Sequence, residues 1–238
     1  MYPTIAFGPL SLPTGPLITI FAVLFGLDVA ARYGRRLGLV ADDVWNAGLL
    51  ALLAGLIAAR LWNILQFWEI YLSEPLLALS IRPSGFVFWP GVIAVLVVGY
   101  GWLIRKAMDP VYTGAAFALG ALAAGTLLHV GAYLTGATVG TLSEPPWALL
   151  HFGELRHPVA LYQAVGTNLL LILLWVTARK TLPGYTILLA GLGYSLLRLL
   201  TDAFVEDAAL LGALRTSQVI ALGMALLCSL LLARQHNK

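Results

Sequence analysis

Three side chains of the stretch Gly191–Asp207 have the types and the spacing to do chemistry inside a membrane. Tyr194, Arg198 and Asp202 are four residues apart in a mostly apolar segment, so a helix places all three on one face. A charged residue within a membrane helix costs about 2.5–3.5 kcal/mol on insertion scales, so it seldom persists without a partner or a task. Arg198 can hold an anion with Asp202 orienting it. The alternatives are a salt bridge with Asp202 alone, or snorkelling to the interface.

Further cationic and ionisable side chains fall within or beside apolar runs. Arg60 stands in LLAGLIAARLWNIL, and His129 stands in the small-residue run AAGTLLHVGAYLTG. Arg156 and His157 precede the fifth apolar run, and Tyr162 follows shortly after them. Excess positive charge inside a helix bundle favours an anionic guest, and a phospholipid head group is the obvious one. The alternatives are an interfacial position for Arg60 and a hydrogen-bonded packing role for His129.

The composition is that of an integral membrane protein. Hydrophobic residues make up 60% of the sequence and charged residues only 11%, whereas soluble domains carry roughly 25% charged residues. The chain has 238 residues and almost no polar stretches, so we expect a single membrane domain, 1–238. No motif for a metal or a cofactor is present, and the single cysteine, Cys228, excludes an internal disulfide. The basic residues are spread along the chain, which argues against a nucleic acid partner.

The apolar runs predict an all-α, polytopic fold with about seven transmembrane helices. A helix needs about 20 mostly apolar residues to cross the hydrocarbon core. The predicted spans are Pro16–Ala31, Val44–Leu65, Phe86–Leu103, Tyr112–Tyr133, Val159–Thr177, Thr186–Leu200 and Ser217–Leu232. The longest connections, Gln66–Gly85 and Leu134–Pro158, are expected to be irregular and to include short helices at the membrane interface.

The basic residues also predict the orientation of the chain. Nine of the 14 lysines and arginines fall on one side of the predicted bundle: Arg32, Arg35, Arg36, Arg105, Lys106, Arg179, Lys180, Arg234 and Lys238. The opposite side carries three arginines and most of the acids: Arg82, Arg156, Arg215, Glu69, Glu74, Glu144, Glu154, Glu206 and Asp207. By the positive-inside rule the N-terminus is outside, the C-terminus is cytoplasmic, and the candidate residues lie toward the outer leaflet.

Several segments resemble those of one protein family, in the same order across nearly the whole chain. LRHPVALYQA resembles the RHPxQLYE segment of prolipoprotein diacylglyceryl transferase, GLGYSLLRLLTDAF resembles its GYGxxRxxxEFFR segment, and GLIAARLWNIL resembles the stretch with GGRxxYV. Members of that family move the diacylglyceryl group of phosphatidylglycerol to the lipobox cysteine of a preprolipoprotein, at the outer leaflet of the bacterial inner membrane. The resemblance implies the same lipid, acceptor protein and multi-pass location for this chain.

The resemblance also implies roles for individual residues. Arg198 matches a functional arginine of the family, Tyr194 the tyrosine before it and Asp202 the acid after it. Arg156, His157 and Tyr162 match the RHP-tyrosine segment, and Arg60 matches the GGR arginine. The resulting hypothesis places catalysis on Arg198, Asp202, His157 and His129, and lipid binding on Arg60, Arg156, Tyr162 and Tyr194, without a cofactor.

The sequence departs from the family pattern in the signature GRxGNFxNxExxG, which falls on GTLLHVGAYLTGATVG. Thr126 replaces the signature arginine, His129 an asparagine, Trp89 the SFHGG histidine and Gln163 a glutamate. Two hypotheses therefore stay open: a divergent transferase, and a catalytically degenerate, lipid-binding subunit or scaffold of a larger membrane complex. A transporter is a third, but the broken helices and the internal repeat typical of one are not seen.

Overall fold

The computed structural model describes residues 4–7, 10–79, 85–177, 182–206, 208–212 and 214–236. Within these ranges seven helices are long and apolar enough to cross a membrane, which confirms the predicted polytopic, all-α class. They are α1 (Thr14–Arg36), α2 (Ala41–Gln66), α4 (Phe88–Arg105), α5 (Pro110–Thr135), α6 (Val159–Thr177), α7 (Pro183–Thr201) and α8 (Thr216–His236). The orientation of the termini stays a prediction. Five residues of that prediction lie outside the described residues: Arg82, Arg179, Lys180, Asp207 and Lys238.

Capping explains why α5 exceeds its predicted span by two residues at each end. The Asp109 carboxylate accepts hydrogen bonds from the main-chain N–H groups of Val111 and Tyr112, at 2.8 and 3.0 Å. Pro110 follows Asp109 as the first helical residue, where its fixed φ suits a helix and its missing N–H costs nothing. At the other end Gly136 adopts φ 74°, in the left-handed conformation that commonly ends helices.

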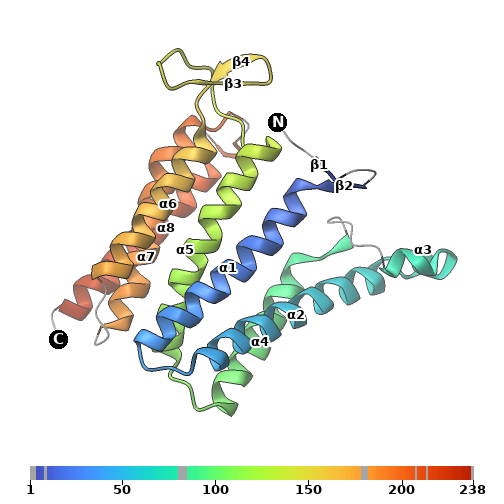
Figure 1. The fold of residues 1–238 in the computed structure, drawn as a ribbon, viewed down its shortest axis with the longest axis vertical. Helices are drawn as coiled ribbons and strands as arrows, with labels where there is room; N and C mark the ends of the chain where they lie inside the picture. Colours follow the sequence, from blue (N-terminus) through green and yellow to red (C-terminus); the bar gives the residue numbers. More distant parts are fainter. Residues whose placement is uncertain are drawn as a thin grey trace.

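Helix α5 is the central helix of the bundle. It contacts α1, α6 and α7, while α8 packs on α7 and α4 packs along α2 (Figure 1). The pair α2 and α4 reaches the rest of the bundle chiefly through α1. The core is built from α1, α5 and α6 around fully buried residues such as Ala30, Tyr33 and Leu119. Most large side chains on the other faces are exposed, as expected where lipid covers a protein.

The connections 37–40 and 106–109 lie together at one end of the bundle, where residues of both line one surface hollow. We call this the basic end, because four basic residues lie there: Arg35, Arg36, Arg105 and Lys106. The opposite end carries the long connections and the short elements. Figure 1 shows α3 (Trp68–Ser73) at the far end of α2, and the hairpin of β3 (Leu149–His151) and β4 (Glu154–Arg156) beyond the ends of α5 and α6.

Short helices and hairpins make up the connections at that opposite end. The helical pieces are α3 (Trp68–Ser73), η1 (Pro75–Leu79) and η3 (Asp202–Phe204). The strands pair as antiparallel hairpins: β1 (Thr4–Phe7) with β2 (Leu10–Pro13), β3 (Leu149–His151) with β4 (Glu154–Arg156), and β5 (Leu210–Leu211) with β6 (Leu214–Arg215). The sequence predicts the short helices but not the hairpins. The turn between β3 and β4 places both Phe152 and Gly153 at positive φ, as tight hairpin turns require.

We predict that Gly120→Ala destabilises the bundle, because α1 and α5 touch backbone to backbone at this point. A Cβ on Gly120 would lie 2.5 Å from the carbonyl oxygen of Gly26 and 2.9 Å from Cβ of Ala30. The helices would have to separate, at a cost of about 1–3 kcal/mol. Thermal unfolding in detergent measures the effect. Gly223→Ala is the matched control, since a Cβ there meets nothing within 4 Å; equal melting temperatures for both variants would contradict the prediction.

Candidate functional site

An arginine–aspartate pair forms the centre of the candidate site. Arg198, near the end of α7, donates from Nε and Nη2 to Oδ2 of Asp202, at 3.0 and 2.9 Å. The Asp202 side chain is 1% exposed, whereas that of Arg198 is 32% exposed. The carboxylate thus lies buried behind a guanidinium that is partly accessible, and Nη1 takes no part in the pair. An arginine held in this way can present its accessible edge to an anion.

Asp202 is held by two further hydrogen bonds, one from Gln163 and one from Arg215. Its Oδ1 accepts from Nε2 of Gln163 on α6 at 2.9 Å, and the same amide nitrogen lies 3.3 Å from Oγ1 of Thr201. Its main-chain oxygen accepts from Nη1 of Arg215 at 2.7 Å, and the same nitrogen donates to the carbonyl of Val205. Because Asp202 is the first residue after α7, these bonds fix both the carboxylate and the path of the chain that leaves the helix.

His129 and Tyr194 extend this group to α5. Nε2 of His129 lies 3.3 Å from Oη of Tyr194, and the two rings are nearly parallel with centroids 6.3 Å apart. The Tyr194 side chain also interacts with Arg198. We call the whole group the Arg198 network; its members are His129, Gln163, Tyr194, Arg198, Thr201 and Asp202. The structure therefore brings together four of the residues that the sequence singled out as site residues: His129, Tyr194, Arg198 and Asp202.

His157 is the centre of a second group, just before α6. Its Nε2 lies 2.8 Å from Oγ of Ser143, and its Nδ1 lies 3.2 Å from Oη of Tyr162. The ring of Phe204 packs against the imidazole with centroids 4.6 Å apart. A neutral imidazole carries one N–H, so one hydroxyl accepts from the ring and the other donates to it. We call Ser143, His157, Tyr162 and Phe204 the His157 cluster.

The short helix η3 joins the two groups. It begins with Asp202, in the network, and ends with Phe204, in the cluster. The main-chain N–H of Thr141 donates to the carbonyl of Phe204 at 2.8 Å, and that of His157 donates to the carbonyl of Thr141 at 3.0 Å. Gly140 fits only as glycine, since a Cβ would lie 2.0 Å from the carbonyl oxygen of His157. The two groups therefore belong to one site.

Arg156 stabilises the same region through acids rather than through the Arg198 network. Its guanidinium pairs with the carboxylates of Glu154 and Glu206 and donates to the carbonyl of Gly140 at 3.1 Å. Burial works to lower the pKa of Arg156, but the hydrogen bonds and the charges of the two glutamates outweigh it and raise the pKa. The arginine therefore stays charged and fastens β4 to the segments on either side of it.

Arg60 is engaged elsewhere, at the junction of α2 with the connection that holds α3 and η1. Its three nitrogens donate to main-chain oxygens: Nε to Ala78 at 3.2 Å, Nη1 to Gly85 at 2.8 Å, and Nη2 to Leu77. The rings of Tyr71 and Phe86 face the guanidinium at 5.5 Å. These contacts anchor the connection, and Figure 1 shows this end of α2 on the far side of the bundle from α7.

Two of the positions where the sequence departs from the resembled pattern, Thr126 and Trp89, lie outside the Arg198 network. Thr126 donates its hydroxyl to the carbonyl of Leu122 on its own helix at 3.0 Å, and Trp89 is 70% exposed. Gln163 differs, because its amide donates the hydrogen bond to Asp202 that a carboxylate could not. The sequence does not single out the partners Ser143, Thr201, Glu206 and Arg215 as site residues. They are common polar residues without a motif, and only the folded chain places them at the site.

Among the described residues no group of three or more histidine, cysteine, aspartate or glutamate side chains could hold a metal ion. A family model described as prolipoprotein diacylglyceryl transferase matches residues 4–234, nearly the entire chain. The chain belongs to this family.

Curated relatives agree with the match to the prolipoprotein diacylglyceryl transferase family. A phosphatidylglycerol–prolipoprotein diacylglyceryl transferase of Clostridioides difficile is 26% identical over 201 residues, covering 84% of this chain and 81% of its own. The corresponding protein of Synechococcus elongatus is 28% identical over 239 residues, covering 90% and 80%. That of Bacillus cereus is 27% identical over 222 residues, covering 86% and 81%. Together with the seven helices, these relatives support a multi-pass membrane protein with a prolipoprotein diacylglyceryl transferase-like function.

We predict that Gln163→Glu destabilises the site, because it would place a second carboxylate beside the buried carboxylate of Asp202. Two carboxylates at hydrogen-bond distance repel each other unless one takes up a proton. We expect a loss of about 1–3 kcal/mol in unfolding free energy, read as a lower melting temperature in detergent at neutral pH. Gln66→Glu makes the same chemical change at the exposed end of α2 and is the control. A Gln163→Glu variant as stable as this control would contradict the prediction.

We predict that the hairpin of β3 and β4 loses stability as the pH falls below about 6.5, because of His151. This side chain is buried between Tyr133 and Phe152, and its Nε2 has no hydrogen-bond partner among the described residues. Burial, and then the positive charge of Arg156, lower the pKa of His151 from its ordinary value of 6.5. The unfolded segment therefore takes up a proton before the folded one does, so stability present above pH 6.5 is lost as the pH falls.

Hydrogen exchange of the hairpin amides at neutral pH and at about pH 5 measures this effect. His151→Phe keeps a ring against Tyr133 but cannot titrate, and is the matched variant. The acid-induced loss of protection should be smaller in His151→Phe than in the unmodified chain. The prediction is wrong when both proteins lose protection equally.

Proposed function

We propose that this chain transfers the diacylglyceryl group of an anionic phospholipid, phosphatidylglycerol, to a cysteine thiol of a preprolipoprotein at the outer leaflet of the bacterial inner membrane. One observation carries the proposal: a partly exposed Arg198 is oriented by a buried Asp202, in a chain of the prolipoprotein diacylglyceryl transferase family. A charged pair of this kind is costly in a membrane helix, so it seldom persists without a function. A guanidinium also matches the geometry of a phosphate better than any other side chain.

The transfer forms one bond and breaks one. The cysteine sulfur bonds to the glycerol carbon that carries the phosphate ester, and the bond between that carbon and the ester oxygen breaks. Glycerol phosphate leaves with the bonding electrons, and the thiol proton passes to a base. Arg198 holds the phosphate and stabilises the charge that develops on the leaving oxygen, while Asp202 and Tyr194 orient the guanidinium.

Two histidines support the proton transfer in this proposal. His157 is the better placed as a base, because Ser143 and Tyr162 fix both ring nitrogens and the loop position leaves it partly exposed. His129 lies deeper, on α5, and reaches Arg198 through Tyr194. A base next to the thiol raises the thiolate fraction and so the rate of attack.

The other predicted lipid-binding residues act through position. Arg156 fastens β4 beside the His157 cluster, and Tyr162 orients the imidazole. Arg60 anchors the connection that holds α3, and the exposed Trp68 of this helix suits the membrane interface. Both arginines thus keep the surroundings of the lipid in place rather than contact its phosphate.

A second candidate function is lipid binding without transfer, as a subunit or scaffold of a larger membrane complex. The observation that favours it is the hydrogen bond of Thr126 to its own helix, at the position of the signature arginine. Because threonine stands where the family signature has an arginine, the phosphate has one arginine fewer to stabilise its charge. The two candidates share the lipid and differ in whether the thioether bond forms.

We expect the chain to restore lipoprotein maturation in a bacterium depleted of its own diacylglyceryl transferase, and Arg198→Ala to abolish the rescue. In a purified assay with fluorescent phosphatidylglycerol and a lipobox peptide, Arg198→Ala should lower transfer at least about a hundredfold, the usual loss when one group that stabilises the developing charge is removed.

Arg32→Ala is the control, because Arg32 is an exposed arginine that also pairs with an aspartate four residues away. It should leave transfer unchanged. Binding of the fluorescent lipid is measured in parallel. Lipid binding that depends on Arg198, without any thioether product, would overturn the transferase and establish the second candidate.

A further inference from the structure

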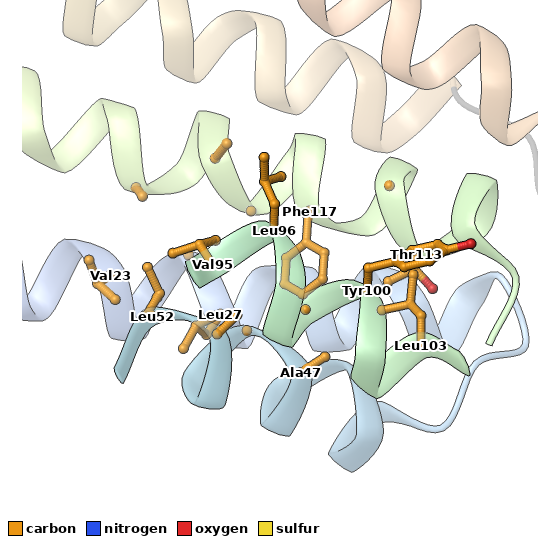
Figure 2. Close-up of a pocket in the computed structure, with 18 of the residues that line it drawn as sticks. Val23, Leu27, Ala47, Leu52, Val95, Leu96, Tyr100, Leu103, Thr113 and Phe117 are labelled. Atoms are coloured by element: carbon orange, nitrogen blue, oxygen red, sulfur yellow. The ribbon is translucent and has the colours of Figure 1, made fainter. Parts of the chain in front are cut away.

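A large apolar cavity lies between α1, α2, α4 and α5, outside the site described above. Its volume is about 500 Å³, and its lining is almost entirely apolar (Figure 2). Ligand pockets commonly measure roughly 300–1,000 Å³. On α5 the lining runs from Pro110 to Ala124, whereas His129, the member of the Arg198 network on this helix, lies farther along it. The cavity therefore occupies the half of the bundle next to the basic end.

The walls of the cavity carry several small residues, some of which, such as Gly48 against Leu27, also lie at close contacts between helices. Gly48, Ala51, Gly99, Gly114 and Ala121 all line the cavity. Small residues in membrane helices normally allow close helix contact, as Gly26 and Gly120 do where α1 meets α5. Helix α4, however, packs along α2 rather than along α5. The small side chains thus leave a space, and an apolar space of this size within a bilayer will be filled by an apolar chain.

One polar group in the lining has no partner. Thr113 on α5 is 1% exposed, and its hydroxyl makes no hydrogen bond in the described part of the chain. A threonine in a helix ordinarily bonds to the carbonyl four residues earlier, as Thr126 and Thr135 do. A buried hydroxyl left without a partner costs about 1–3 kcal/mol, so an acceptor that reached Thr113 from the cavity would be stabilised there.

The basic end next to the cavity carries positive charge. Lys106 lies one turn beyond the lining residue Leu103, pairs with Asp43 at 2.8 Å and packs over the ring of Trp102. Arg105 beside it is exposed. Thr113 lies one helical turn inside the start of α5. A lipid whose head group lay beside these cations would have its ester groups at about the depth of Thr113.

The length of the cavity fits one leaflet. Eleven residues separate Thr113 from Ala124, which is about 16 Å of helix. That is about half of the hydrocarbon core, which measures about 30 Å. A chain that enters at Thr113 and ends at Ala124 would therefore stop near the middle of the bilayer.

The geometry points to a phospholipid site at the basic end, in which an acyl chain fills the cavity between α4 and α5, an ester carbonyl accepts from Thr113, and an anionic phosphate lies beside Lys106 and Arg105. This lipid belongs to the leaflet opposite the Arg198 network, so the site is independent of the proposed transfer reaction. The bound lipid would connect the α2–α4 pair directly to α5. Without the lipid, this pair contacts the rest of the bundle chiefly through α1.

Native mass spectrometry of the delipidated full chain, titrated with phosphatidylglycerol, tests this site, with a photoreactive group on the acyl chain to locate each bound lipid. Crosslinks should fall on α4 and on the first half of α5. Gly99→Leu should lower the crosslinking there at least about tenfold, because it fills the cavity. Gly101→Leu is the matched control: it makes the same change two residues along α4, where a Cβ meets nothing within 4 Å.

Thr113→Val keeps the shape of the side chain and removes the hydroxyl, and should weaken binding about fivefold, as expected for one hydrogen bond. Zwitterionic phosphatidylcholine should bind more weakly than phosphatidylglycerol. Equal crosslinking in Gly99→Leu and Gly101→Leu, or crosslinks confined to α7 and its surroundings, would overturn the proposal. Loss of crosslinking in Arg198→Ala would also overturn it, because it would assign the lipid to the other site.

Discussion

The site depends on burying one carboxylate, that of Asp202. In an apolar environment this group is tolerable only when its oxygens are satisfied, and Arg198 and Gln163 satisfy them from two different helices. The same residue lies where α7 ends and η3 begins, so its position also sets the path of the chain toward the His157 cluster. The charge that orients the arginine and the bend that brings Phe204 onto the imidazole thus have a common origin. A change at Asp202 reaches both groups at once.

Close backbone packing supplies the rest of the precision. The contact of Gly26 with Gly120 places α1 against α5, and the contact of Gly140 with the carbonyl of His157 places the 139–143 segment against the start of α6. Contacts between backbones leave no side chain that could change rotamer, so they hold an element in one position. The α2–α4 pair has fewer such contacts with the remaining helices, and it is also the part of the bundle that borders the large cavity.

The sequence predicts the fold class, and it also predicts that Tyr194, Arg198 and Asp202 lie together, for physical reasons. A run of about twenty apolar residues has one stable form in a bilayer, which is a helix. Tyr194, Arg198 and Asp202 are four residues apart, so they lie on one face of that helix. The roles of His157, Arg156 and Arg60 are harder to predict. The sequence pattern around a polar or charged side chain is the same whether that side chain binds a ligand or a main-chain carbonyl. Only the fold shows that Arg60 bonds to main-chain oxygens and Arg156 to glutamates. The hairpins and partners such as Ser143 depend on contacts between distant segments, which no local pattern encodes.

The bond from Arg215 to the main chain of Asp202 has a consequence for the smallest unit that can carry the site. Arg215 directly precedes α8, and Gln218 in the first turn of that helix donates to the carbonyl of Leu199. The last helix packs on α7 and contributes no member to the Arg198 network, yet it closes the end of α7 on which the carboxylate lies. A chain cut between residues 202 and 215 would retain every residue of the network and lose the bonds from Arg215 and Gln218 that hold the end of α7 in place. The C-terminal helix is therefore part of the site's framework, and a boundary drawn from sequence motifs alone would leave it out.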